Sequence, residues 1–330
     1  MILRTIGLVV TLALGLLAGP LPAEAQEATE IPRIGLLHSA SAAVTLFTDA
    51  FWQGMRELGY VEGKNYGLEI RARGAKTDRL SNLAAELVHL KVDIIVTVGF
   101  PALRAAKEAI STIPIVMITG SDPVKRGIVA SMAHPGGSIT GVVTMSVGLS
   151  GKRLELLAEI VPGVKRIAVL TTSRRFAARE GRLYKELEAA ARTLGVKLQI
   201  LKARDPDTID SAFLEMTKGR AEALTMTPSA RYVQHRERIV KHAAKNRMPS
   251  IYFHRIHVES GGLITYGIKY ADLYRRMAIY VDKILKGAKP GELPIEQPTK
   301  FQLVINLKTA KQLGITIPPS ILYRADKVIK

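Results

Sequence analysis

The chain has 330 residues, of which 47% are apolar and 5% aromatic, so it can bury a large core and is longer than one typical domain requires. It has no cysteine, which excludes disulfide bonds and a lipid-carrying cysteine after a leader peptide. Its 47 Lys and Arg against 29 Asp and Glu leave two interpretations: an anionic partner such as nucleic acid or a membrane surface, or a solvated basic exterior, which is favoured because the charges are scattered.

The N-terminus has the three parts of an export signal. Arg4 supplies a positive charge, residues 6–19 are apolar, and Ala23-Glu24-Ala25 has the small-x-small spacing of a cleavage site. The apolar run is shorter than the ~20 residues that span a bilayer, which disfavours an uncleaved transmembrane anchor. The sequence therefore predicts a signal peptide over residues 1–25, cleaved near Ala25, and a soluble product in the periplasm.

After the leader, apolar periodicity alternates between strands and helices. A buried strand at residues 33–37 precedes a helical pattern that ends at Gly59. The next predicted elements are, in order, strand 66–72, helix 80–90, strand 94–98, a further helix and strand 113–119. This order is typical of successive parallel-sheet units.

The same order starts again at residue 166. The predicted elements are strand 166–170, helix 181–195, strand 197–203, helix 208–219, strand 221–227, helix 232–246 and strand 248–253. Equivalent landmarks recur at offsets of 136, 127 and 135 residues, in the pairs Gly59 and Gly195, Pro101 and Pro228, and Pro114 and Pro249. Such constant offsets indicate an internal duplication that is too long for a solenoid repeat.

The predicted fold class is therefore α/β, with two doubly wound parallel-sheet lobes joined by a multi-strand hinge. The last part of the chain adds a strand at 261–267, a helix at 270–287, and a final strand and helix at 301–314. We expect these elements to return to the first lobe. The predicted domains are 32–145 with 262–330 for a discontinuous first lobe, and 146–261 for the second.

Open parallel sheets bind ligands beyond the carboxyl ends of their strands, where free N–H groups of helix N-termini attract anions. The candidate ligand-binding residues are Ser39, Ser41, Gly99, Phe100, Pro101, Ser121 and Asp122 in the first half, and Thr172, Ser173, Arg174, Ser229, Tyr252 and Tyr266 in the second. Hydroxyl and backbone N–H groups suit a carboxylate, Asp122 suits an ammonium group, and the aromatic rings can stack on a flat group. The alternative is that these residues only form turns and cap helices.

Catalytic and metal-binding interpretations have little support in the sequence. It contains no G-x-G-x-x-G after a strand, no G-x-x-x-x-G-K-[ST] and no G-x-S-x-G. His254 and His257 have an i, i+3 spacing, but no third metal ligand is evident. Trp52 is expected on a helix face that packs on the sheet, and adjacent Arg174 and Arg175 are more typical of a solvated loop than of a carboxylate clamp. We expect no metal, no cofactor and no enzymatic activity.

Several long segments together resemble one known family. They are FWQGMRELGYVEGKNYGLEIR, DRLSNLAAELVHLKVDIIVTVG, STIPIVM, DPVKRGIVASMAHPGGSITGV, LSGKRLELLAEIVPGVKRIAVL, ESGGLITYG and LYRRMAIYVDKILKGAKPGELPIEQPTKFQLVINLKTAKQLGITIPPS. From about Arg33 to Lys330 the chain is similar to the ABC-transporter substrate-binding proteins that include tryptophan- and tyrosine-binding members.

The resemblance implies a type I periplasmic binding fold, capture of a small solute between two lobes, and delivery to an ABC permease and ATPase in the inner membrane. It carries the binding site onto the loops at 39–41, 99–101, 121–122, 172–174 and 229. At one loop the chain departs from the family, which commonly has an acidic Ser-Asp-Pro where this sequence has Thr227-Pro228-Ser229. The expected ligand is an aromatic amino acid or another small carboxylate.

We expect a monomer that closes on its ligand, because a solute that touches both lobes stabilises the closed form. Two other functions are considered. A transcription regulator of the same fold needs a DNA-reading helix-turn-helix before the first lobe, where the leader stands, so no nucleic-acid partner is expected. A secreted two-domain enzyme acting on a small solute in the same cleft is the alternative, and turnover of the solute would distinguish it from a binding protein.

Overall fold

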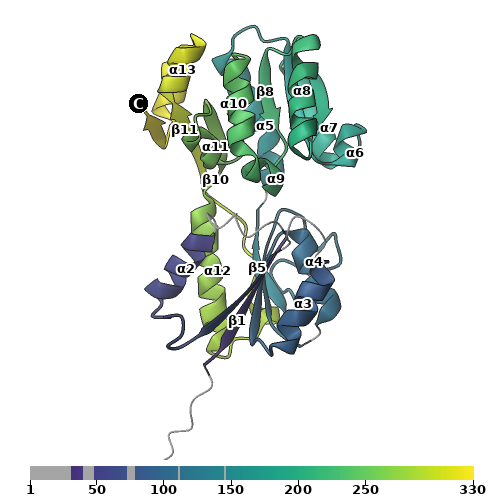
Figure 1. Ribbon diagram of the computed structural model, residues 1–330, viewed down its shortest axis with the longest axis vertical. Helices are drawn as coiled ribbons and strands as arrows, with labels where there is room; N and C mark the ends of the chain where they lie inside the picture. Colours follow the sequence, from purple (N-terminus) through teal and green to yellow (C-terminus); the bar gives the residue numbers. More distant parts are fainter. Residues whose placement is uncertain (1–30, 40–47, 73–78, 111, 145) are drawn as a thin grey trace, which may run out of the picture. The chain divides into compact units, whose positions relative to one another are not determined.

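The computed structural model describes residues 31–39, 48–72, 79–110, 112–144 and 146–330 (Figure 1). The predicted signal peptide lies outside the described residues. Pro32–Lys330 forms one compact unit. Within the described residues, no helix is both long and apolar enough to cross a membrane.

The first sheet of the described chain is parallel and has the strand order β2-β1-β3-β4-β5. Its strands are β1 (Arg33–His38), β2 (Gly67–Ala72), β3 (Ile94–Val98), β4 (Ile115–Thr119) and β5 (Ile139–Val143). In the register, Ile34 of β1 lies opposite Leu68 on one side and Ile94 on the other. This confirms the parallel-sheet fold predicted for the first half of the sequence.

Helices cover both faces of this sheet (Figure 1). They are α2 (Thr48–Glu57) and α12 (Tyr270–Leu285) on one face, and α3 (Leu80–His89) and α4 (Phe100–Ala109) on the other. Side chains of β4 alternate between two cores, so that Val116 and Ile118 pack towards α12 while Ile115 and Met117 pack towards α4. Because both faces are covered, the central strands are buried along their whole length.

Helix α12 comes from the last quarter of the sequence but completes the first lobe. A Cβ atom at Gly54 of α2 would lie 2.9 Å from the Cβ of Ala278, so the glycine lets the two helices approach closely. The Tyr60 hydroxyl donates to Asp282 at 3.0 Å, and burial together with this carboxylate raises the pKa of Tyr60 to about 12. Trp52 packs against the same core, edge-to-face with Phe51 at 4.5 Å, as expected from the helical pattern.

The second lobe repeats the first sheet and then extends it. Strands β6 (Arg166–Thr171), β7 (Lys197–Lys202) and β8 (Ala223–Met226) are parallel in the order β7-β6-β8. A bridge between Leu224 and Ser250 links β8 to the segment before β9 (Ile251–Tyr252), which pairs in parallel with β10 (Ile264–Ile268). The order 7-6-8-9-10 is that of 2-1-3-4-5, which agrees with the predicted duplication.

The final strands do not return to the first lobe, so that part of the prediction is wrong. Strand β11 (Phe301–Asn306) pairs antiparallel with β10, and β12 (Lys327–Ile329) pairs with β11. Leu303 and Ile305 of β11 pack in the core of the second lobe because β10 offers them an unpaired edge there. Of the described elements that follow β10, α12 and the segment around η3 (Pro290–Glu292) lie with the first sheet, where the Thr140 hydroxyl donates to the Leu293 carbonyl at 2.7 Å.

The helices of the second lobe form two layers, visible in Figure 1. One core gathers side chains of α8 (Pro206–Lys218), α9 (Ala230–Gln234), α10 (Arg236–Lys245) and α11 (Arg255–Glu259). The other gathers side chains of α5 (Ser150–Ile160, after η2 at Ser146–Leu149), α6 (Arg174–Ala177), α7 (Arg182–Thr193), α13 (Leu307–Leu313) and α14 (Pro319–Tyr323). The chain passes between the two sheets three times, after β5, after β10 and before β11, which agrees with a multi-segment connection.

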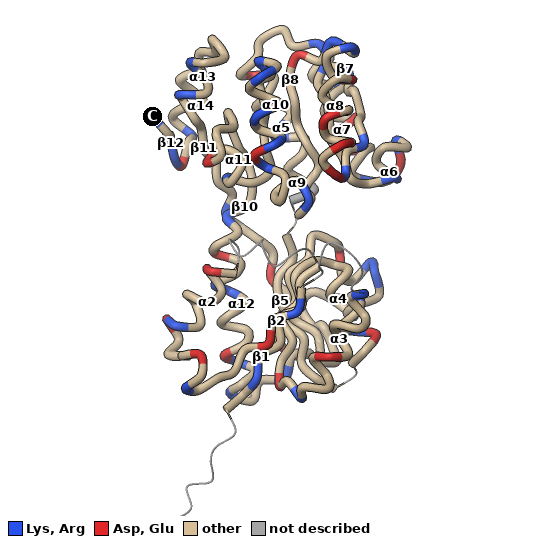
Figure 2. The backbone as a smooth tube through the Cα atoms, in the orientation of Figure 1, with Lys and Arg blue, Asp and Glu red and all other residues tan. Residues whose placement is uncertain are grey.

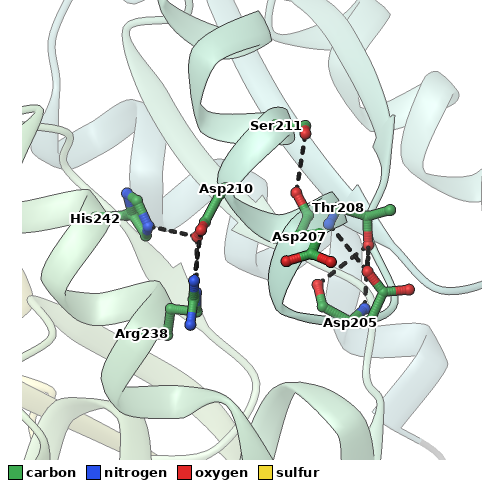
Figure 3. A network of polar contacts seen from close by, with 7 residues as sticks. All are labelled: Asp205, Asp207, Thr208, Asp210, Ser211, Arg238 and His242. Carbon is green, nitrogen blue, oxygen red and sulfur yellow. Dashed lines mark hydrogen bonds and ion pairs between the residues drawn. The ribbon is translucent and has the colours of Figure 1, made fainter.

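A network of polar side chains ties α8 to α10 (Figure 3). Asp210 of α8 accepts from Arg238 Nε at 2.7 Å and Nη2 at 2.5 Å, and contacts His242 Nε2 at 2.7 Å. Arg238 and His242 are one helical turn apart, so both reach the same carboxylate. The Arg238 guanidinium and the His242 contact hold the pKa of Asp210 well below its usual range.

Loss of this carboxylate is expected to destabilise the second lobe in a pH-dependent way. Because the folded pKa of Asp210 is depressed, its stabilisation is present above the unfolded pKa of about 3.9 and is lost as the pH falls through the folded value. Asp210→Asn should therefore unfold at a lower temperature than the parent near pH 7, and the difference should shrink below about pH 4. Asp207→Asn on the same helix is the control, and an equal loss of stability in both variants at pH 7 would contradict this account.

Candidate functional site

In the first lobe, the strand order places the candidate loops at the point where the sheet topology switches. In an open sheet of order 2-1-3-4-5, ligands bind outside the carboxyl ends of the first and third strands. Ser39 directly follows β1 and its N–H donates to Val98 O at 3.0 Å, while Gly99 follows β3 and its N–H donates to Ile118 O at 2.9 Å. The structure thus brings Ser39 and Gly99 together. Ser41 lies outside the described residues.

Gly99 adopts a backbone conformation that only glycine tolerates, with φ 89° and ψ 150°. A Cβ atom at this position would lie 2.3 Å from the Ser39 hydroxyl oxygen. Helix α4 begins immediately after Gly99 and has no side-chain cap, so the N–H groups of Phe100 and Ala102 point out of its first turn without a helical acceptor. Pro101, which is exposed, has no N–H group. The loop therefore presents backbone donors at a positive helix end.

The loop after β4 is held by its own side chains. Ser121 N–H donates to the Thr119 hydroxyl at 3.1 Å. One carboxylate oxygen of Asp122 accepts from the N–H groups of Val124 and Lys125, both at 3.1 Å, and the other lies 3.8 Å from the Lys125 ammonium group. Asp122 thus has a capping role in this structure, which is the alternative considered from the sequence.

Phe100 is half-buried beside the start of α4. The guanidinium of Arg126 lies over its ring, 5.1 Å from the centroid, in a cation–π contact. One face of the ring is therefore covered by a side chain of its own lobe.

In the second lobe, the loops after β6 and β8 lie side by side. The Thr172 hydroxyl contacts the Ser229 hydroxyl at 3.4 Å, and the buried Thr227 hydroxyl donates to Thr171 Oγ1 at 3.2 Å. Ser229 caps α9 by accepting from Arg231 N–H at 3.3 Å. These strands occupy the positions of β1 and β3 in the first sheet, so the two lobes present loops at equivalent positions.

The same edge carries an arginine that the sequence alone did not single out. Arg204 follows β7, is half-buried, and its Nε donates to the Thr172 carbonyl at 2.9 Å, which fixes the guanidinium beside Thr172. Arg174 is exposed at the start of α6, and Ser173 caps that helix by accepting from Phe176 N–H at 3.3 Å. Arg204 is therefore the better-positioned cation. Its position directly after the predicted strand 197–203 was the available signal.

Of the two tyrosines expected to stack on a ligand, Tyr252 is placed elsewhere. Its side chain is fully buried, its ring stacks on His257 at 4.9 Å, and its hydroxyl accepts from Ser250 at 2.7 Å. It belongs to the core of the second lobe, so the expectation that it lines the site is wrong for this structure. Tyr266 on β10 is half-buried, 6.2 Å from the Phe301 ring, and its carbonyl accepts from the buried Arg153 at 3.2 Å.

The histidine pair has structural partners. His254 Nδ1 accepts from Ile256 N–H at 3.1 Å, and its ring lies 4.6 Å from that of Tyr270. His257 faces two carbonyls, those of His254 at 3.1 Å and Tyr232 at 3.2 Å, and burial lowers its pKa to about 4. Among the described residues, no three His, Asp or Glu side chains gather as metal ligands do.

A cavity of about 230 Å³ lies at the other edge of the second sheet, before β9 and β10. Ser250, Gly262 and Thr309 are among the residues that line it. It is smaller than the roughly 300–1,000 Å³ of sites for drug-sized ligands, and the candidate residue among those that line it is Tyr252.

The backbone of Gly99 gives a direct test of how the first-lobe loops are built. Gly99→Ala should lower the free energy of unfolding by about 1–3 kcal/mol, because the conformation is strained for any residue with a Cβ. Gly67→Ala, at an ordinary φ and 3.7 Å from the Arg33 side chain, should change it little. If Ser39→Gly restored Gly99→Ala completely in chemical denaturation, contact with Ser39 rather than backbone strain would be the cause.

Several known proteins are similar to this chain in sequence or structure. The family model described as ABC transporter substrate binding protein matches residues 39–329. A curated relative, "Tyrosine-binding protein" of Clostridioides difficile (strain R20291), is 25% identical over 265 residues, which are 80% of this chain and 75% of the relative. A conserved domain protein from Vibrio cholerae has a similar structure, with TM-score 0.79, 26% identity, and coverage of 91% of this chain and 100% of that chain. An ABC domain from Streptococcus pneumonia, solved in complex with L-Trp, has TM-score 0.78 and 25% identity at the same coverage. The chain thus belongs to the ABC transporter substrate-binding protein family, has the type I periplasmic binding fold of these neighbours, and captures a small molecule for an ABC importer.

Proposed function

We propose that the solute of this protein is a small aromatic carboxylate, held between the strand-end loops of the two lobes. The observation that carries the proposal is the donor set at the equivalent switch points of the two sheets. The first lobe offers the N–H groups that begin α4, and the second offers the hydroxyls of Thr172 and Ser229 with the guanidinium of Arg204. Each of these groups hydrogen-bonds well to a carboxylate.

An ammonium group has weaker support than a carboxylate. Asp122 is occupied by two backbone N–H groups and lies near Lys125, so its charge is largely compensated within its own loop. The second lobe has Thr227-Pro228-Ser229 where the family commonly has an acid. We therefore infer that the amino group of an amino acid contributes little to binding.

The aromatic part of the proposal is supported by the relatives. One is named for tyrosine and the solved neighbour contains L-Trp. In this chain, Phe100 and Tyr266 are the candidate side chains for contact with a ring. Tyr266 is half-buried, and Phe100 is fixed by Arg126.

Capture follows from differential binding to two arrangements of the lobes. A solute that contacts both lobes binds the closed arrangement better and shifts the population towards it. A change from 1:99 to 99:1 needs about 5.5 kcal/mol of differential affinity, which several charge-assisted hydrogen bonds and one buried ring can supply. The importer then receives the closed, loaded form. The family assignment favours this transport function over the secreted enzyme considered from the sequence.

A panel of related solutes tests the ligand class. Calorimetric titration should detect binding of 3-(4-hydroxyphenyl)propionate or indole-3-propionate, which keep the carboxylate and ring but lack the amino group. Tyramine and tryptamine, which lack the carboxylate, should not bind. Binding of the amines, or amino acids that bind over about tenfold more tightly than the propionates, would contradict the proposed class.

Arginine variants locate the carboxylate within the site. Arg204→Gln should weaken propionate binding about tenfold or more, because a charge-assisted hydrogen bond is lost. Lys185→Gln removes one charge from an exposed position on α7 and is the matched control. Equal effects of the two variants would show that overall charge, and not a contact of Arg204, governs affinity.

We further propose that the mature protein is a periplasmic monomer produced by cleavage near Ala25. The leader pattern and the extracytoplasmic role of the family support this. Intact mass spectrometry of protein exported by a double-membrane bacterium should give a chain that begins near Gln26. A full-length mass in the periplasmic fraction would contradict the cleavage.

A further inference from the structure

The positive charge of this protein is distributed unevenly between its two lobes. Residues 32–145 and 269–296, which make the first lobe, contain 18 Lys and Arg against 13 Asp and Glu. Residues 146–268 and 297–330, which make the second, contain 28 against 13. The excess is therefore mostly a property of the second lobe.

The topology gathers much of this excess at one edge. In a parallel sheet each helix ends where the next strand begins, so helix C-termini and strand starts meet at the amino edge. Arg166 at the start of β6 pairs with Lys197 of β7, and Lys197 N–H donates to Lys165 O at 2.8 Å. At the ends of α8 and α10, Thr217 contacts Asn246 at 3.4 Å. Because β11 is antiparallel, α13 also begins at this edge, where the Thr309 hydroxyl donates to Gly261 O.

We call this set of residues the basic edge. It consists of Lys165, Arg166, Arg192, Lys197, Lys218, Arg220, Lys245, Arg247, Lys308 and Lys311, all of them exposed. In Figure 2, Lys and Arg are seen at the ends of α8 and α10 that approach it.

The basic edge is poorly neutralised. Within the described residues, Arg192 is the member that forms an ion pair, with Glu188 at 2.9 Å. Glu222 also lies there, but it accepts the backbone N–H groups of Lys165 and Arg166, which lower its pKa. Elsewhere in the lobe, basic side chains such as Arg182 and Arg238 have acidic partners. The edge therefore presents a surplus of unpaired positive charge.

Helix stability alone does not account for these side chains. A basic residue near a helix C-terminus interacts favourably with the helix dipole. Arg220 and Arg247, however, have positive φ values of 54° and 49°, a conformation that favours glycine. By contrast, α7 of the same lobe is followed by a glycine, Gly195, with φ 68°. The described non-glycine residues with positive φ are all basic, and the others are Lys91 and Arg179. Charge at 220 and 247 is thus kept at a conformational cost.

We propose that the basic edge docks this protein on an anionic phospholipid membrane. The surface fits lipid headgroups better than a protein partner, because protein interfaces are enriched in aromatic residues and depleted in Lys, whereas this edge is rich in Lys. None of its segments carries an exposed aromatic side chain within the described residues; Leu214 of α8, one turn before Lys218, is an exposed apolar side chain nearby. Clustered Lys and Arg bind anionic bilayers electrostatically, within a Debye length of the surface.

Docking in this orientation leaves the solute loops uncovered. The basic edge is the amino edge of the second sheet, and Thr172, Ser173 and Ser229 follow the carboxyl ends of its strands. The inference relies on the export implied by the family, and does not depend on which solute is bound. Its consequence is a raised concentration of the carrier next to the membrane that holds the importer.

Vesicle sedimentation with the mature protein tests the proposal. At low salt the protein should sediment with phosphatidylcholine vesicles that contain phosphatidylglycerol, and about tenfold less with phosphatidylcholine alone. The bound fraction should fall as salt shortens the Debye length. Equal binding to neutral and anionic vesicles would overturn the proposal.

Two charge-matched variants locate the surface. The edge variant carries Lys218→Glu, Arg220→Glu, Lys245→Glu and Arg247→Glu, and the control carries Lys64→Glu, Lys91→Glu, Lys283→Glu and Lys289→Glu, all exposed positions of the first lobe. The edge variant should lose binding about tenfold, and the control should lose much less. Equal losses would mean that net charge alone acts. Should the edge variant melt early in circular dichroism, the corresponding Gln variant gives the same comparison.

Solute titration separates this proposal from the proposed function. The edge variant should bind solute as the parent does, since its substitutions lie at the opposite edge of the sheet. If the parent protein binds solute but does not bind anionic vesicles, the docking surface is overturned and the solute class is unaffected. If neither protein sediments with vesicles but the edge variant still slows uptake by a reconstituted importer, the edge contacts a protein partner, and the lipid proposal is wrong.

Discussion

The constraint on which this structure depends is the parallel pairing of strands that are joined by helices. Each helix must cross a face of the sheet, so the strands are buried on both faces and every loop that follows a strand emerges at one edge. Ser39 and Gly99 are distant in sequence but meet through this rule, and so do Thr172 and Ser229. The site chemistry is therefore supplied by topology, and the individual loops need only be short and polar. Gly99 is the exception, because its backbone conformation is itself part of the loop.

Exchange of elements between the lobes follows from the same constraint. A duplicated unit of five strands leaves one face of the first sheet without its last helix, and α12 fills that position after the chain has completed the second lobe. Gly54 makes the fit possible by removing a side chain where α2 meets Ala278. The chain then returns to the second lobe, where β11 extends the sheet. Three connections consequently join the lobes, which restricts their relative motion more than a single linker would.

Much of the fold could be predicted from the sequence because buried strands and amphipathic helices have distinct apolar periods, and because the duplication repeats them. The destination of the last strand could not, since FQLVIN has the same buried pattern whichever sheet receives it. At the site, the loop positions were predictable from strand ends, but side-chain direction was not. Tyr252 ends β9 and was expected to line the site, yet its side chain is buried in the core, where its ring stacks on His257. Arg204 was overlooked because its position after a predicted strand does not by itself distinguish it from the many other arginines, whereas its contact with Thr172 does.

The charge of the protein shows how one physical effect gives two edges of a sheet opposite chemistry. Helices begin at the carboxyl edge, where their N-terminal dipoles favour hydroxyls, glycine and bound anions, and they end at the amino edge, where Lys and Arg are favoured. In the sequence these basic residues are separated by whole βα units, so they look scattered and suggest a solvated exterior. Folding brings them to a single edge of the second lobe, while the first lobe, built on the same plan, has a smaller basic excess, 18 Lys and Arg against 13 Asp and Glu. Helix dipoles are common to both lobes, so they cannot explain why the second lobe has the larger basic excess. A requirement specific to the second lobe must explain it.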